Sequence, residues 1–461
     1  MRKLLFLLLF FPFLATAAEY QVKVHVTNLP ENSGPKLLKI FNGDIYVIDS
    51  LPHIDNETLT FTVPDGTDPG MLRIILGFTP YAKYTNGQPT TVDILFNREN
   101  VEFTTDFNSP DKSLVINQSD ENKMYFDFLK QDMGFYSKLG ILEQTVTQYP
   151  DKDEFYNLAL RYYEQYQQDR DKIIQDIHKK NPHSLAAKII YTRRMPFSKG
   201  NTPAATRDSI FKAEFLNAVD FQDTTLLFTN VYTDKLYQYI NFYMTRNSSP
   251  RENEANIIRA VDEIMPKISV NDKVRNTLLQ FLIGGFESMK LEEVLAHISA
   301  NYMQQCGSDM DIVKRRLEAY QKMAVGNKVP DMLTMDINNN PVSLYGSLNP
   351  YTLLIFWHSD CGHCQLLVQE LPSLINSEFF KKHNINVVGI SIDENREDWV
   401  KYSEAHPLNW TNTFVEGAFN SQVAVDYNLF ATPSMFLLDN ENKIVAKPLT
   451  VEEVLESINK L

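Results

Sequence analysis

The chain has 461 residues, 43% of them hydrophobic, so it is long enough for two or three domains that each bury a core. Its 44 Lys and Arg residues face 58 Asp and Glu residues, which gives a formal net charge of −14, and no long basic run interrupts this acidity. That balance excludes nucleic acid as a routine partner. Three cysteines are too few for a fold that depends on disulfides.

The first 17 residues have the pattern of an export signal. A basic start at positions 2–3 is followed by an apolar run over 4–14 and by a small-residue cleavage site at 15–17. The apolar run is shorter than the roughly 20 residues that span a bilayer. We therefore predict a signal peptide over 1–17 and a mature protein that is periplasmic or otherwise exported and soluble after cleavage. A retained N-terminal anchor is the alternative.

Residues 18–119 have the pattern of a small β domain. Turn signals such as Asn42-Gly43, Pro64-Asp65-Gly66 and Asn86-Gly87 separate short runs of β-branched and aromatic residues. Six of these runs are predicted strands: Tyr20–Val26, Tyr46–Ile48, Leu59–Val63, Leu72–Leu76, Val92–Phe96 and Val101–Phe103. We predict an antiparallel β-sandwich. The region holds no candidate nucleophile, metal cluster or phosphate loop, so its predicted role is interaction or positioning.

Residues 120–324 change to a helical period and predict a central α-helical domain. Apolar side chains at helical spacing begin at Met124 and continue in eight further segments: Phe155–Ile177, Leu185–Met195, Ile210–Val219, Thr233–Met244, Ala255–Met265, Val274–Met289, Leu291–Met303 and Ile312–Met323. Prolines mark the predicted breaks, at Pro150, Pro182, Pro203, Pro250 and Pro266. The domain is consistent with either a homodimer interface or a cradle for a protein substrate, and the sequence does not separate these two roles.

The C-terminal part contains the residues with the clearest chemistry. The run Leu353–Trp357 is continuously apolar, as in a parallel strand buried on both faces, and Cys361-Gly362-His363-Cys364 follows it closely. Apolar residues then recur at helical spacing, at Leu367, Leu371, Leu374, Ile375 and Phe379. We predict that Cys361 lies at the N-terminus of a helix, with Cys364 one turn inside it. Free N–H groups and the helix dipole favour a thiolate there, and the thiolate is the attacking species in disulfide exchange.

Other roles for these cysteines fit the sequence less well. A structural zinc site needs four ligands, and the third cysteine, Cys306, has no partner pair; it is interpreted as a free or buried thiol. A peroxide-reducing site needs a threonine and a proline upstream of the attacking cysteine, where this chain has Leu354 and His358. Copper delivery usually requires a wider cysteine spacing and a distant histidine. We therefore predict no metal site.

From about residue 325 to 461 the chain resembles the thioredoxin superfamily. The strand, the Cys-Gly-His-Cys motif and the helix carry the resemblance, together with Thr432-Pro433 directly before the apolar run 434–438. The order of the remaining elements also agrees: a strand at Ile385–Ile392, a helix at Asn395–Ala405, a hairpin partner at Lys443–Lys447 and a closing helix from Val451. The lead-in at 326–344 is similar to the secreted TlpA- or ResA-like branch. The predicted fold class is thus multidomain, α+β and α/β, with a β-sandwich-like domain, an α-helical domain and a C-terminal thioredoxin-like fold over 325–461.

This resemblance implies roles for individual residues. Cys361 is expected to attack a substrate disulfide and Cys364 to resolve the mixed disulfide, while Thr432 and a cis Pro433 position the substrate next to them. His363 can favour the Cys361 thiolate electrostatically, which makes the disulfide more oxidising. Because Gly-His is the dipeptide of protein disulfide isomerase, this pair indicates a redox potential in the middle of the range from about −270 to about −120 mV.

Two positions depart from the family pattern and leave the proton acceptor for Cys364 open. Ile355 stands where thioredoxin carries a buried acidic residue, and Leu367 stands where the ResA-like branch carries a glutamate. Glu370, Asp360 or water remain as candidate acceptors. With His363 and Trp357, both carboxylates are expected to tune the site.

The sequence therefore predicts an exported thiol–disulfide oxidoreductase that acts on protein disulfides, as a reductase or an isomerase. Its redox group is the Cys361–Cys364 disulfide, and no other cofactor is expected. The predicted partners are exported proteins with disulfides or thiols and a membrane-bound thiol protein that supplies electrons. The alternative is a binding or redox-sensing protein that recognises exported partners through its β and helical domains.

Overall fold

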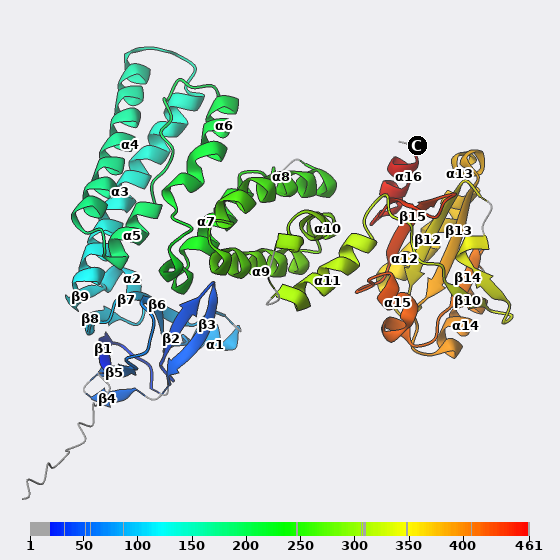
Figure 1. The fold of residues 1–461 in the computed structure, drawn as a ribbon, viewed down its shortest axis with the longest axis horizontal. Helices are drawn as coiled ribbons and strands as arrows, with labels where there is room; N and C mark the ends of the chain where they lie inside the picture. Colours follow the sequence, from blue (N-terminus) through cyan, green and yellow to red (C-terminus); the bar gives the residue numbers. More distant parts are fainter. Residues whose placement is uncertain are drawn as a thin grey trace, which may run out of the picture. The chain divides into compact units, whose positions relative to one another are not determined.

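The computed structural model describes residues 19–459 apart from positions 32, 51, 56, 86, 246–247, 306, 308–309, 347–348 and 407 (Figure 1). The predicted signal peptide and Cys306 lie outside the described residues. Two compact units are present: the first comprises the chain up to 248 together with 259–281, and the second comprises 249–258 together with 282 onward. In the part of the chain that is described, no helix has both the length and the apolar character that crossing a membrane requires.

The N-terminal strands of the first unit form two sheets. One has the order β4-β5-β1-β8-β9 and the other β3-β2-β6-β7. The bounds are β1 (Tyr20–Thr27), β2 (Lys36–Phe41), β3 (Asp44–Asp49), β4 (His53–Asp55), β5 (Thr58–Val63), β6 (Gly70–Gly77), β7 (Thr90–Phe96), β8 (Val101–Asp106) and β9 (Val115–Gln118), with the short helices α1 (Pro80–Tyr84) and α2 (Pro110–Ser113). Alternate residues of both sheets, such as Val24, Phe61 and Ile74, are fully buried in one shared core. The two sheets therefore pack as a sandwich.

The β domain differs from its prediction in its pairing and its strand number. β1 and β8 pair in parallel, with Val22 opposite Val101, so the sandwich is not purely antiparallel as predicted. β2, β4 and β9 were not predicted. The turn at Asn42-Gly43 was predicted and joins β2 to β3, with both residues at positive φ, 51° and 86°. Two consecutive left-handed residues match the twist of a tight hairpin, which explains the Asn-Gly sequence.

Helices follow the sandwich and fill the middle of the chain. They are α3 (Asp120–Gln148), α4 (Glu154–Lys180), α5 (Leu185–Thr192), α6 (Ala204–Glu214), α7 (Val231–Asn241), α8 (Pro250–Ile268), α9 (Asp272–Ser288), α10 (Glu292–Asn301) and α11 (Asp311–Lys322), with 3-10 turns η1 (Phe215–Ala218), η2 (Thr224–Phe228) and η3 (Met303–Gln305). The predicted helical region is confirmed, although Pro266 does not end its helix, because α8 continues to Ile268. Pro250 opens the same helix, where no N–H is needed.

A buried ion cluster connects α3 and α4 and the chain after α5. The carboxylate of Asp132 is 1% exposed and accepts hydrogen bonds from the Nε of Arg170 at 2.6 Å and from the Nε of Arg193 at 3.0 Å. Arg170 also donates from Nη2 to the carbonyl oxygen of Arg193 at 2.9 Å. A buried carboxylate requires such partners because water no longer solvates it.

The C-terminal sheet has seven strands in the order β11-β10-β14-β13-β12-β15-β16. The bounds are β10 (Leu333–Asp336), β11 (Pro341–Ser343), β12 (Tyr351–Trp357), β13 (Ile385–Ser391), β14 (Thr411–Phe414), β15 (Ser434–Asp439) and β16 (Ile444–Ala446). The helices are α12 (Gly362–Asn376), α13 (Glu378–His383), α14 (Arg396–Ala405), α15 (Gln422–Asp426) and α16 (Val451–Asn459), with 3-10 turns η5 (Leu344–Gly346) and η6 (Ala418–Asn420). The arrangement is mixed: β12 pairs in parallel with β13 and antiparallel with β15.

The central strand β12 explains why its sequence is continuously apolar. Leu354 and Phe356 enter the core on one face of the sheet, together with Tyr427 that follows α15. Leu353, Ile355 and Trp357 enter the core on the other face, which contains side chains of α12 and α16. Both faces of β12 are therefore covered, as predicted for a buried strand. This packing fixes the end of the strand directly before the cysteine motif.

Candidate active site

Cys361 is the N-cap residue of α12. Its backbone is extended, with φ −93° and ψ 114°, and its sulfur accepts the N–H of Cys364 at 3.3 Å. The positive end of the helix dipole thus lies at this sulfur. Cys361 is partly exposed, whereas Cys364 has no exposed surface and belongs to the core beneath α12. The two thiols therefore have different surroundings, although only two residues separate them.

These surroundings shift the two pKa values in opposite directions. For Cys361, burial raises the pKa, but hydrogen bonds from the thiol and N–H of Cys364 and from Thr432 outweigh it, so the net pKa is lowered. Burial raises the pKa of Cys364 to about 12, and the hydrogen bond with Cys361 contributes in the same direction. At neutral pH the accessible sulfur is therefore the better nucleophile, and the buried sulfur stays protonated.

Thr432 and Pro433 lie beside Cys361 despite being about seventy residues later in the chain. The Cys361 thiol donates to the carbonyl oxygen of Thr432 at 3.5 Å, and the Thr432–Pro433 peptide bond is cis. The pairing of β12 with β15 produces this proximity, because Phe356 is opposite Ser434 in the register. The structure thus brings together both cysteines and the predicted substrate-positioning pair.

A buried carboxylate that the sequence analysis missed supports the loop before Cys361. Asp393 is 1% exposed and accepts from the N–H of Ser359 at 3.1 Å, from the Ser359 hydroxyl and from the Ser391 hydroxyl. The loop is further held by Gln365, whose side chain donates to the Ser359 carbonyl oxygen at 2.8 Å. Asp393 follows β13, and the parallel neighbours β12 and β13 end at the same edge of the sheet. Its position after a predicted strand could therefore have indicated that it lies near the cysteine motif.

His358 is also part of this network. Its Nε2 is 2.9 Å from a carboxylate oxygen of Glu394, and its Nδ1 accepts the N–H of Asp360 at 3.0 Å. The same Nδ1 lies 3.3 Å from a carboxylate oxygen of Asp393. The bond from His358 lowers the pKa of Glu394. His358 therefore shapes the turn that leads into α12.

The remaining predicted tuning residues are placed less directly. Trp357 is 1% exposed and donates from Nε1 to the side-chain oxygen of Asn412 at 3.1 Å, so it packs in the core that contains Cys364. The backbone N–H of His363 contributes to the lowered pKa of Cys361, while its side chain is exposed. Asp360 and Glu370 are both exposed, unlike the Cys364 thiol.

Neither of the two positions that depart from the family pattern supplies a carboxylate for Cys364. Ile355 and Leu367, at the two departures from the family pattern, are both buried among apolar side chains. Tyr402 is a further neighbour: burial and the Cys364 sulfur raise its pKa, and its ring lies 5.5 Å from Trp357. A phenol whose pKa is raised keeps its proton at neutral pH and so does not act as the base.

Comparisons with known proteins found a family model and solved structures that this chain resembles. Residues 349–444 match the family described as thioredoxin-like. A thioredoxin-like protein from Bacteroides caccae is 21% identical, with 58% of this chain and 97% of that chain covered and a TM-score of 0.43. The thioredoxin domain of a thiol-disulfide oxidoreductase from Bacteroides vulgatus is 29% identical, with 30% and 96% covered and a TM-score of 0.28. A thiol:disulfide interchange protein from Bacteroides sp. is 28% identical, with 30% and 91% covered and a TM-score of 0.28.

No curated protein matches the chain. The match over 349–444 includes β12, both cysteines and the cis Thr432–Pro433 bond, and these elements occupy one continuous sheet with its covering helices. Fold, motif position and family match thus agree for the same residues. The C-terminal part of the chain belongs to the thioredoxin superfamily.

Proposed function

We propose that this protein is an exported thiol–disulfide oxidoreductase that acts on protein disulfides through Cys361 and Cys364. The observation that carries the proposal is the asymmetry of the two thiols: a partly exposed sulfur with a lowered pKa at the start of α12, and a buried sulfur with a raised pKa one turn inside. Disulfide exchange needs one accessible thiolate that attacks the substrate and a second thiol that resolves the mixed disulfide.

In the proposed reaction the Cys361 thiolate attacks one sulfur of the substrate disulfide. A new S–S bond forms between Cys361 and the substrate, and the other substrate sulfur leaves as a thiolate and takes a proton. Cys364 then loses its proton and attacks Cys361, which releases the second substrate thiol and leaves a Cys361–Cys364 disulfide. Two electrons have passed from the enzyme to the substrate. A membrane-bound thiol protein is the proposed donor that restores the dithiol.

The substrate chain is proposed to lie against Thr432 and Pro433. Proline has no N–H, so this segment leaves neighbouring backbone groups available to an extended chain, as in the addition of a strand to a sheet edge. The partly exposed sulfur of Cys361 lies next to the Thr432 carbonyl oxygen, so a substrate paired here would present its disulfide to the attacking thiolate.

Reduction of insulin by dithiothreitol tests the proposal on the purified protein. We expect catalysis by the wild type, none by Cys361→Ser, and accumulation of mixed disulfides by Cys364→Ser, because its attacking thiol remains while the resolving thiol is lost. Cys306→Ser is the matched control and is expected to retain full activity. Turnover that survives the loss of both motif cysteines would show that the site is not the catalyst.

The direction of electron flow is a separate measurement. Equilibration of the purified protein with glutathione buffers gives the reduction potential of the pair. We expect a value near the −180 mV of protein disulfide isomerase, because the Gly-His dipeptide favours the reduced form. A value near −270 mV would instead assign a reductase of the thioredoxin kind. Refolding of a scrambled disulfide protein distinguishes isomerase activity directly.

A further inference from the structure

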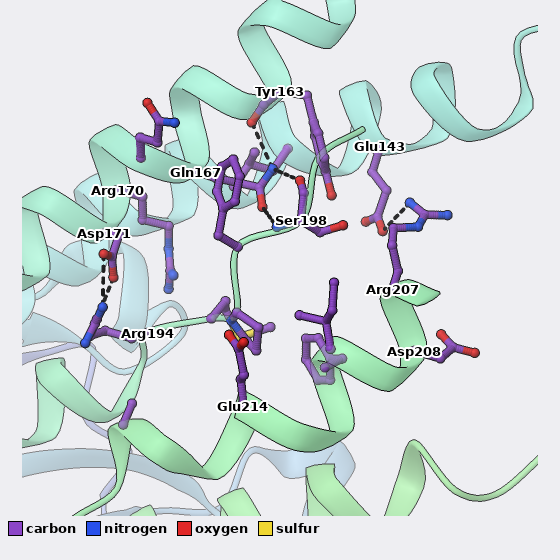
Figure 2. A pocket seen from close by; sticks show the side chains of 18 of the residues that line it. Glu143, Tyr163, Gln167, Arg170, Asp171, Arg194, Ser198, Arg207, Asp208 and Glu214 are labelled. Carbon is purple, nitrogen blue, oxygen red and sulfur yellow. Dashed lines mark hydrogen bonds and ion pairs between the residues drawn. The ribbon is translucent and has the colours of Figure 1, made fainter. Parts of the chain in front are cut away.

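A pocket lies in the first compact unit, among helices that contain none of the redox-site residues. It has a volume of about 810 Å³ and is lined by α3, α4, the segment after α5, α6 and η1 (Figure 2). Sites for small organic ligands typically measure about 300–1,000 Å³ and combine an apolar lining with a few polar groups that fix orientation. The size of this pocket is therefore that of a ligand site.

One wall of the pocket consists of large apolar side chains that are open to solvent. Met195, Phe197 and Phe242 are each 39% exposed and all line the pocket. Phe211 lines it as well and packs edge-on against Phe242, with 4.2 Å between the ring centroids. Exposed apolar side chains that gather at one concave site mark a binding surface rather than chance exposure. An occupant with an aromatic or aliphatic body would cover this wall.

The polar side of the pocket contains a cation with an unused donor. The Nη1 of Arg207 is buried and makes no hydrogen bond, and its nearest carboxylate oxygen, of Glu143, is 3.9 Å away. The Arg207 side chain is 19% exposed, whereas Glu143 is 58% exposed and remains solvated. Figure 2 shows Glu143 on α3 facing Arg207 on α6. A buried charged donor without a partner destabilises the protein, so a missing acceptor is the natural explanation.

The other two arginines that line the pocket have their partners within the protein. Arg170 is held by the buried carboxylate of Asp132 at 2.6 Å. Arg194 is held by Asp171 at 2.5 Å from Nε and 3.1 Å from Nη2. Among the lining arginines of the described chain, the free donor is therefore on Arg207.

The charge balance limits the kind of anion that fits. Four basic and four acidic side chains line the pocket: Arg170, Arg194, Arg207 and Lys212, and Glu143, Asp171, Asp208 and Glu214. The acidic side chains of the lining would repel a doubly charged phosphate, because no surplus of positive charge is present to offset that repulsion. A single negative charge matches the single free donor. A carboxylate also accepts from a guanidinium in favourable geometry.

We propose that this pocket binds an organic carboxylate with an apolar body, in which the carboxylate accepts from Arg207 and the body covers Phe197, Phe211 and Phe242. The same chemistry occurs in a free small acid and in the C-terminus of a peptide that ends in an apolar residue. The inference does not depend on the proposed function, because none of its residues takes part in the redox site.

Calorimetric titration of the full chain tests the inference with two pairs of probes. 3-Phenylpropanoate is compared with the neutral 3-phenylpropan-1-ol, and N-acetyl-Gly-Gly-Phe with its C-terminal amide. We expect each acid to bind at least tenfold more tightly than its neutral counterpart. Binding of the small acid alone identifies a small-molecule site, and tighter binding of the peptide acid identifies a peptide C-terminus as the source.

Two variants connect the binding to the named residues. Arg207→Gln is expected to weaken the acids at least tenfold and to leave the neutral probes unchanged, whereas Phe197→Ala weakens acids and neutral probes alike. Arg161→Gln, at an exposed position of α4 outside the pocket, is the matched control and keeps wild-type affinity. Equal affinity for acid and alcohol, undiminished binding by Arg207→Gln, or no binding of any probe would each overturn the inference. Should Arg207→Gln fail to fold, the Phe197→Ala variant and the acid–alcohol comparison on the wild type still decide it.

Discussion

The unequal reactivity of the two motif cysteines is the most direct consequence of the structure. We expect iodoacetamide at pH 7 to label Cys361 long before Cys364 in the reduced, folded protein. Cys361 is partly exposed and has a pKa below the ordinary 9.0 of a thiol, whereas Cys364 is fully buried and has a pKa of about 12. Alkylation requires the thiolate, so both pKa and access act in the same direction.

The size of the effect follows from the two pKa values. At pH 7 a thiol of pKa 12 is ionised to about 1 part in 10⁵, and one below pKa 9 to more than about 1 part in 10², which is at least about a 10³-fold difference in thiolate. A more basic thiolate is intrinsically more nucleophilic, with a Brønsted coefficient of about 0.4–0.5. This effect favours Cys364 and reduces the preference for Cys361 by roughly 15- to 30-fold. A preference of at least about 30-fold remains before steric shielding is counted.

Peptide mass spectrometry on timed samples measures the two labelling rates separately. The same measurement in denaturant is the control, because both cysteines are then exposed and their rates should converge. Thr432→Val adds an internal test: it keeps the side-chain shape, removes the hydroxyl that helps to lower the pKa of Cys361, and should slow labelling of Cys361 at pH 6–7. Labelling of the folded protein at similar rates, or of Cys364 first, would refute the pKa assignment.

Three further predictions concern buried charges and are measured by urea unfolding. Asp132→Asn leaves Arg170 and Arg193 without a counter-charge and should lower the free energy of unfolding by about 3–5 kcal/mol. The exposed control Asp127→Asn should lower it by less than about 0.5 kcal/mol. Equal effects of the two substitutions would contradict the buried ion cluster. Asp393→Ala removes the acceptor for the loop before the cysteines and should cost about 2–4 kcal/mol; a cost below 0.5 kcal/mol would contradict its bracing role. Burial lowers the pKa of Lys235 from 10.5 to about 7, so between these pH values the unfolded chain binds one proton more than the folded protein. Lys235→Met should therefore be more stable than the wild type at pH 7, and this difference in the free energy of unfolding should shrink towards pH 10. A difference that does not depend on pH would contradict the lowered pKa.

Local patterns predicted those parts of the fold that depend on local physics. The continuously apolar β12 and the helix after Cys361 were readable because a strand buried on both faces and an amphipathic helix impose different periods on the sequence. The Asn42-Gly43 turn was readable because two left-handed residues require it. β2 was missed because Leu37, Leu38 and Ile40 are all buried, so its polar and apolar residues do not alternate strictly.

The pocket between α3, α4 and α6 could not be predicted from sequence patterns. Arg170, Arg194 and Arg207 look alike in the sequence. Only the folded structure shows that two of them hydrogen-bond to carboxylates, whereas the third has a buried donor without a hydrogen bond. Charged residues on a helix usually form a solvated face, so their presence in the sequence does not mark a binding site. The distinction depends on which helices pack together, and no periodicity encodes that.

The support for the cysteine loop illustrates the same limit at the redox site. Asp393 reaches Ser359 because Trp357 is opposite Ser391 in the parallel pairing of β12 and β13, and the N–H of Ile392 bonds the Trp357 carbonyl oxygen at 2.8 Å. A register slip of one residue would turn every side chain of β13 to the opposite face and would remove the carboxylate from the loop. The buried apolar residues of β13 disfavour that slip, because it would exchange the two cores. The packing of the sheet, which determines the fold, therefore also determines where the Cys361 sulfur lies.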